Sequence, residues 1–184
     1  MISDDSVPFT RSVISARDLA YDDLGLPLAG LLCWDEAQDG PRPGVLLIHG
    51  GAGLDAHARE QARRYAALGY AVLACDMFGP GVAGNRERVM ACLLALRDDP
   101  ALLLRRARAD LTALAACPEA AGRLAAVGFC FGGTGNWSCT ARAEHGFTHR
   151  DAVPGAMPGV AYDRLADERS FAAVRTFLAE ALAA

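Results

Sequence analysis

A cysteine set between glycines is the first residue of this chain that could do chemistry. Residues 128–133 read Gly-Phe-Cys-Phe-Gly-Gly, which matches the pattern G-x-S-x-G with Cys130 in the serine position. In that pattern the nucleophile lies on a sharp turn after a strand, where small neighbours let the chain pass closely. The N–H group of Phe131 could then stabilise a developing oxyanion. The alternative is a core cysteine in a glycine-rich turn.

A thiol nucleophile needs a base, and the chain offers four histidines, at positions 49, 57, 145 and 149. Enzymes with this turn place the histidine after the nucleophile, so only His145 and His149 qualify. His145 lies in a loop-like Glu-His-Gly-Phe sequence, and loops often carry catalytic residues. His145 is therefore the predicted base, with His149 as its competitor. Either could instead be a solvent-facing loop histidine.

A metal site is the third interpretation of these residues. His145 and His149 have a spacing that suits one helix face, and Cys130 or Cys139 could complete the ligand set. However, Gly146 argues against a helix there, and short histidine pairs are common without metal. We therefore expect neither a metal nor a cofactor.

Apolar runs predict the strands that would position these residues. Residues 44–49, 70–75 and 124–129 are continuously apolar, which is typical of strands buried on both faces. Residues 9–34 predict two extended segments, and the sequence Asp-Asp-Leu-Gly at 22–25 predicts a hairpin turn between them. The third apolar run ends directly before Cys130, where the nucleophile turn requires a strand.

Helical patterns alternate with these strands. They cover residues 55–68, 85–97, 100–116 and 163–182. Gly69 is expected to end the first helix, and Phe171, Val174 and Leu178 share the face of the last one that should pack on the sheet. Strands alternating with helices predict parallel pairing, so we expect one α/β domain over residues 1–184, a three-layer sandwich with a mostly parallel sheet.

Composition excludes several classes of function. The net charge is -4, the pI is about 5.5, and 52% of the residues are hydrophobic, enough for a substantial core. We expect the solvent-facing side of an amphipathic helix to carry Arg105, Arg106 and Arg108. Neither nucleic acid nor membrane is therefore an expected partner. No secretory leader and no run of ~20 apolar residues is visible, which predicts a cytoplasmic protein. In that compartment most of its cysteines are expected to be buried apolar residues.

Several motifs in order resemble those of the dienelactone hydrolase family of α/β-hydrolases. They are the turn at 128–133, the segments at 42–54 and 68–79, and the His-Gly-Phe sequence at 145–147. The resemblance covers about residues 18–133 and 136–182. It implies a cofactor-free hydrolase that opens small carboxylic esters or lactones with a Cys-Asp-His triad.

The resemblance also assigns roles by position. Cys130 would be the nucleophile and His145 the general base, and the N–H groups of Phe131 and Gly51 would be the oxyanion donors. The sulfur would attack the substrate carbonyl, and water activated by His145 would release the acid from a thioester.

Two substrate-binding positions depart from the family. Dienelactone-cleaving members have a glutamate where this chain has Gly50, and an arginine where it has His149. The glutamate helps control the resting thiol, and the arginine contacts the substrate carboxylate. We therefore expect Gly50 and His149 to contact a substrate other than dienelactone itself.

The interval between nucleophile and base is the largest departure. Only 14 residues separate Cys130 from His145, whereas the family places a helix, further strands and the triad acid there. The resemblance therefore implies that this chain is truncated relative to the family, with a block of residues missing between Thr134 and Asn136.

The missing block would take the triad acid with it. Glu144, Asp76 and Asp151 are the candidates to replace that acid, with Asp76 otherwise expected to be a turn or capping residue. The alternative to an active hydrolase of small esters is a catalytically impaired relative that survives as a binding or dimerising domain, such as a homodimer.

Overall fold

The computed structural model describes residues 12–133, 146–156 and 160–183. Its sheet has five strands, in the spatial order β1-β2-β4-β3-β5. The strands are β1 (Ile14–Asp23), β2 (Leu26–Asp35), β3 (Arg42–Ile48), β4 (Ala71–Ala74) and β5 (Ala120–Gly128).

The three predicted apolar strands form the centre of this sheet. β3 pairs in parallel with β4 on one side and with β5 on the other, as predicted. β2 is antiparallel to both β1 and β4, so four of the five strands run in the same direction. The sheet is therefore mixed, and the carboxyl ends of β3, β4 and β5 meet at one edge, where ligands bind in such folds.

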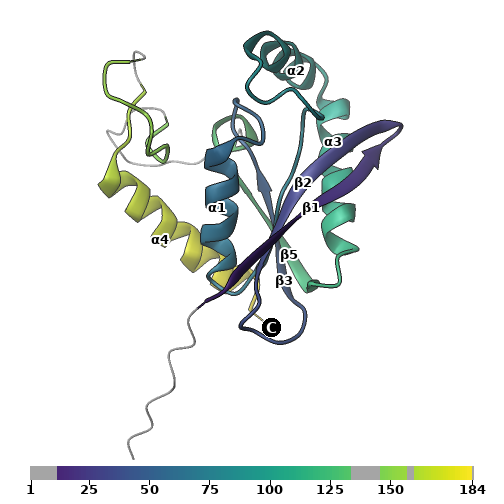
Figure 1. The fold of residues 1–184 in the computed structure, drawn as a ribbon, viewed down its shortest axis with the longest axis vertical. Helices are drawn as coiled ribbons and strands as arrows, with labels where there is room; N and C mark the ends of the chain where they lie inside the picture. Colours follow the sequence, from purple (N-terminus) through teal and green to yellow (C-terminus); the bar gives the residue numbers. More distant parts are fainter. Residues whose placement is uncertain (1–11, 134–145, 157–159, 184) are drawn as a thin grey trace, which may run out of the picture.

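The predicted hairpin is confirmed, and its turn has two residues. Leu24 and Gly25 both have positive φ, 51° and 90°, which is the conformation of a type I′ turn. The side chain of Asp22 accepts a hydrogen bond of 2.8 Å from the N–H of Gly25. The twist of such a turn matches the twist of the strands, so the hairpin continues into a long two-stranded ribbon (Figure 1).

All four predicted helices are present. They are α1 (Ala56–Ala66), α2 (Arg86–Asp98), α3 (Pro100–Ala115) and α4 (Arg164–Ala181). Each begins after a residue whose side chain accepts a backbone N–H of the first turn; these residues are Asp55, Asn85, Asp99 and Asp163. Gly69, with φ of 94°, follows α1 as predicted.

The helices cover the sheet in two layers. α1 and α4 lie side by side on one face, and α3 lies on the other face with α2 above it (Figure 1). Tyr65 of α1 and Leu178 of α4 pack on the first face, and Phe171 and Val174 join them as predicted. Leu114 of α3 packs on the second face. The three-layer α/β prediction is therefore confirmed.

The face of the sheet beneath α3 is incompletely covered at β5. Among the described residues β5 pairs only with β3, so it forms the edge of the sheet. Ala126 of β5 is exposed and Leu124 is half-buried. Leu104 and Leu111 of α3 are 53% and 39% exposed. Apolar surface is therefore open to solvent next to the end of β5.

Most of the described cysteines are buried, as predicted. Cys33, Cys75 and Cys117 are buried and Cys92 is half-buried, whereas Cys130 is exposed. No helix in the part of the chain that the structure describes is long and apolar enough to cross a membrane.

Candidate active site

Cys130 lies where β5 ends and the chain turns sharply. It begins a short 3-10 helix, Cys130–Gly133, and its φ of 50° is in the left-handed region that a side-chain-bearing residue rarely adopts. The N–H of Phe129 donates to the carbonyl of Ile48, and the N–H of Gly132 donates to the carbonyl of Phe129. The first bond attaches the turn to the end of β3 and the second closes the turn, with the exposed thiol of Cys130 at the edge of the sheet.

Glycines allow this turn to lie against the loop after β3. A Cβ on Gly132 would lie 2.7 Å from the carbonyl oxygen of Ile48 and 2.9 Å from that of His49. A Cβ on Gly50 would lie 3.6 Å from the Cβ of Cys130, an ordinary contact. Gly132 is therefore required by space, as the G-x-C-x-G pattern predicts, and Gly50 borders the candidate nucleophile.

His49 fixes the loop that carries Gly50 and Gly51. The N–H of Met77 donates to Nε2 of His49 over 3.2 Å, so Nδ1 carries the proton and donates to the carbonyl of Gly50 over 2.7 Å. Burial lowers the pKa of His49 despite the hydrogen bond to Gly50, so the ring is neutral. Sequence reasoning missed this role, although a histidine directly before a glycine-rich turn marked the position.

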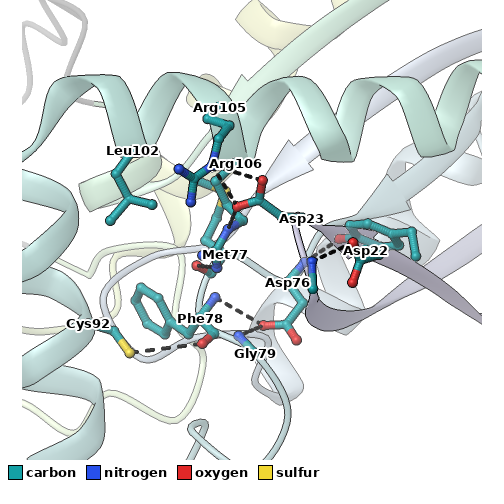
Figure 2. A network of polar contacts seen from close by, with 12 residues as sticks. Asp22, Asp23, Asp76, Met77, Phe78, Gly79, Cys92, Leu102, Arg105 and Arg106 are labelled. Carbon is teal, nitrogen blue, oxygen red and sulfur yellow. Dashed lines mark hydrogen bonds and ion pairs between the residues drawn. The ribbon is translucent and has the colours of Figure 1, made fainter.

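A second network holds Met77 in place, and it corrects one prediction. Arg106 was expected on the wet side of α3 but is buried, with its Nε donating to Asp23 over 2.7 Å and its Nη1 to the carbonyl of Met77 over 2.8 Å. Figure 2 shows Arg105 reaching the same carboxylate, over 3.0 Å. Although burial alone would raise the pKa of Asp23, the two guanidinium groups lower it. The prediction was wrong because the partner of Arg106 lies 83 residues away along the chain.

The carboxylate of Asp76 stabilises the turn after β4. It accepts the N–H groups of Phe78 over 3.1 Å and of Gly79 over 2.9 Å (Figure 2). It also accepts the N–H group of Ala29 over 3.4 Å. This is the turn role that the sequence offered as the alternative to a triad acid. The other described candidate acid, Asp151, is exposed in the loop of residues 146–156.

The ring of His149, which comes from the loop of residues 146–156, packs against helix α1. It stacks on the ring of His57 with centroids 3.7 Å apart and planes 16° apart, and His57 meets the ring of Phe129 edge-on at 5.3 Å. Arg150 adds an ion pair of 3.1 Å to Glu60. Burial and the neighbouring His149 ring lower the pKa of His57, because two charged rings would repel each other. His149 is therefore held near the residue that precedes Cys130.

Several predicted residues lie outside the described part of the chain. These are His145, Glu144 and Cys139, together with the interval between Thr134 and Asn136. The pairing of Cys130 with His145 therefore stays a prediction, and the alternative metal site, which the sequence did not favour, lies partly outside the described residues. Within residues 12–133, 146–156 and 160–183 no group of three or more His, Cys, Asp or Glu side chains could hold a metal ion.

Residues 28–144, more than half of the chain, match the Dienelactone hydrolase family. Two solved structures match over almost their whole length. One is titled m3DLH (29% identity, 92% of this chain, 99% of that chain, TM-score 0.83). The other is a dienelactone hydrolase-like promiscuous phosphotriesterase, P91, from metagenomic libraries (30% identity, 91% and 98%, TM-score 0.82).

A longer structure shares the fold alone. A putative dienelactone hydrolase from Klebsiella pneumoniae is 24% identical, with 66% of this chain covering 52% of that one and a TM-score of 0.56. No curated protein sequence matches the chain.

Proposed function

Because the chain belongs to the dienelactone hydrolase family and is thus a hydrolase, we propose that it cleaves small carboxylic esters or lactones with Cys130 as nucleophile. One observation carries this proposal: Cys130 is the exposed cysteine among the described ones, and it lies in a left-handed turn at the carboxyl end of β5. A cysteine with only a structural role would be buried and would not require a strained backbone, so both features favour a reactive role for Cys130.

The reaction proceeds through a thioester. His145 takes the proton of the Cys130 thiol, and the sulfur attacks the carbonyl carbon of the substrate. The N–H groups of Phe131 and Gly51 donate to the oxyanion that forms. The intermediate collapses to a thioester as the leaving oxygen takes the proton from His145. Water that loses a proton to His145 then attacks the thioester, and the acid product leaves as the thiol is restored.

Gly50 and His149 shape the substrate side of the site. Gly50 leaves open the space beside the Cβ of Cys130, which a larger side chain would fill. His149 is fixed by its stack on His57, so its ring can donate to or accept from a polar group of the substrate. An imidazole is a weaker partner for a carboxylate than a bidentate guanidinium, which favours neutral esters.

A catalytically impaired chain is the second candidate. Asp76 accepts hydrogen bonds from three backbone N–H groups, which favours its role in the turn over a role as the triad acid. Without an acid, the base has neither a fixed tautomer nor a stabilised imidazolium, a loss worth ~10⁴ in rate in a serine triad. A thiol ionises more easily than a hydroxyl, so the loss should be smaller here. We therefore expect slow turnover.

The test is p-nitrophenyl acetate turnover combined with peptide mass spectrometry. We expect slow release of p-nitrophenolate and an acetyl group on the peptide that contains Cys130. Cys130→Ala should lose both signals, and Cys92→Ala, which changes a half-buried cysteine, should keep them. Turnover that survives Cys130→Ala, or acetylation of another cysteine, rules the nucleophile out.

A restored chain separates the two candidates. A variant that carries the family's segment between Thr134 and Asn136 should turn over faster than the unmodified chain. Equal turnover by the two proteins would show that this chain needs no further acid, and the impaired alternative would then fall.

A further inference from the structure

An apolar groove is lined in part by Phe131 and Gly132, the two residues that follow the candidate nucleophile. It consists of two adjoining hollows, of about 240 Å³ and 490 Å³, that share Pro100, Leu103 and Phe131. We call it the α2–α3 groove. The smaller hollow is completed by Ile48, Met77, Leu104, Ala107 and Gly132, and the larger one by Met90, Leu93, Leu94, Leu96 and Arg97.

The groove adjoins both candidate oxyanion donors. Phe131, which follows Cys130 directly, lines both hollows. Leu93, which lines the larger hollow, has its Cδ1 atom 3.5 Å from the position of a Cβ on Gly51. A substrate whose carbonyl lies between Phe131 and Gly51 therefore has the groove next to it.

The lining of the groove selects apolar ligands. Among the described residues that line it, Arg97 is the single charged one, and the Nε of Arg97 lies 2.7 Å from a carboxylate oxygen of Asp98. Met90 and Leu94 of α2 are 48% and 42% exposed. A ligand that covers them removes apolar surface from water, which is favourable in proportion to the area covered. The larger hollow also lies within the usual range of small-molecule sites, about 300–1,000 Å³.

We propose that the α2–α3 groove binds the apolar acyl chain of the substrate, so that esters of medium-chain carboxylic acids are the preferred substrates. This proposal rests on the proposed function, since it places the substrate carbonyl at Cys130. The acid product carries the same chain as the substrate and therefore occupies the same groove.

The binding test uses the product acids and does not depend on catalysis. Octanoate, butyrate and acetate are titrated calorimetrically into the Cys130→Ala protein. Since each buried methylene adds to affinity, octanoate should bind at least about tenfold more tightly than butyrate. The double variant Met90→Gln/Leu94→Gln should lose this difference. The matched control Leu165→Gln changes a residue of α4 that is 50% exposed on the opposite face, and it should keep the difference.

Kinetics on the unmodified chain separate the two proposals. The value of kcat/KM should rise from p-nitrophenyl acetate to p-nitrophenyl octanoate, and Met90→Gln/Leu94→Gln should flatten the series. If octanoate binds no more tightly than butyrate, or if Leu165→Gln loses the difference as well, the groove proposal is overturned while acetate turnover still supports the hydrolase. If octanoate binds as expected but no ester is cleaved, the groove stands as a binding site and the hydrolase proposal falls.

Discussion

The backbone at Cys130 adopts a conformation that an L-residue avoids at a cost of about 1–2 kcal/mol. Its φ of 50° turns the chain out of β5 and leaves the thiol exposed. One close approach is required by the turn: Gly132 lies against the carbonyl groups of Ile48 and His49, whereas Gly50 makes only an ordinary contact with the Cβ of Cys130. The absence of a side chain at Gly132 is therefore as necessary to the site as the presence of the thiol.

Gly132→Ala should destabilise the protein by about 1–3 kcal/mol, the usual cost of inserting a methyl group where none fits. The new Cβ would lie 2.7 Å from a backbone oxygen that cannot move without disturbing β3. Gly50→Ala should cost much less, because its Cβ has 3.6 Å to the nearest atom. Urea denaturation measures both changes, and equal losses would contradict the steric argument.

The elements around the site are joined by one chain of polar contacts. Asp23 at the end of β1 binds Arg106 of α3, and Arg106 donates to the carbonyl of Met77 after β4. Met77 in turn donates to His49, which holds the carbonyl of Gly50. The loop with the candidate oxyanion donor Gly51 is therefore held through contacts that begin at the hairpin.

Arg106→Gln should cost about 3–5 kcal/mol of stability, because it leaves the buried carboxylate of Asp23 with one guanidinium and the carbonyl of Met77 without its donor. Arg105→Gln is the matched control. Arg105 binds the same carboxylate, but its side chain is 47% exposed, so its loss should cost about 1 kcal/mol or less. Urea denaturation of the two variants is the measurement, and similar losses would show that burial does not distinguish the pairs.

The stability of the whole molecule depends on a buried acid between α3 and the hairpin. Asp110 is fully buried, and neither of its oxygens meets hydrogen-bond geometry with a donor. Burial raises the pKa of Asp110 to about 7, and the charge of Asp76 acts in the same direction. The nearby Tyr21 hydroxyl, Cys75 thiol and Arg106 guanidinium lower this pKa, but they do not offset the effect of burial. The folded protein therefore holds a proton that the unfolded chain releases near pH 3.8.

This difference gives a pH dependence of known sign. A carboxyl whose pKa is raised in the folded state favours folding most at low pH, and its contribution is lost as the pH rises from about 4 to about 7. Asp110→Asn has no proton to lose, so its stability relative to the unmodified chain should increase over that interval by at most about 4 kcal/mol. Thermal or urea denaturation at pH 4, 6 and 8 measures the difference. Parallel curves for the two proteins would refute the assignment.

Local patterns in the sequence determined most of the fold. The helices begin at Asp55, Asn85 and Asp163 because a short polar side chain there accepts an N–H only a few residues later. The turn at residues 128–133 could be predicted for the same reason, since the steric demand at Gly132 and the turn at Cys130 involve neighbouring residues. The α/β class followed from the alternation of these elements.

Tertiary structure alone decided which polar residues are buried and what they contact. The pattern of α3 places Arg106 among other arginines, and only the arrival of Asp23 from the hairpin makes its burial favourable. The stack of His57 on His149 and the α2–α3 groove arise in the same way, from elements that are distant in sequence. Periodicity reports which face of a helix is apolar, whereas the pairing of charges and the shape of a hollow depend on what packs against that face.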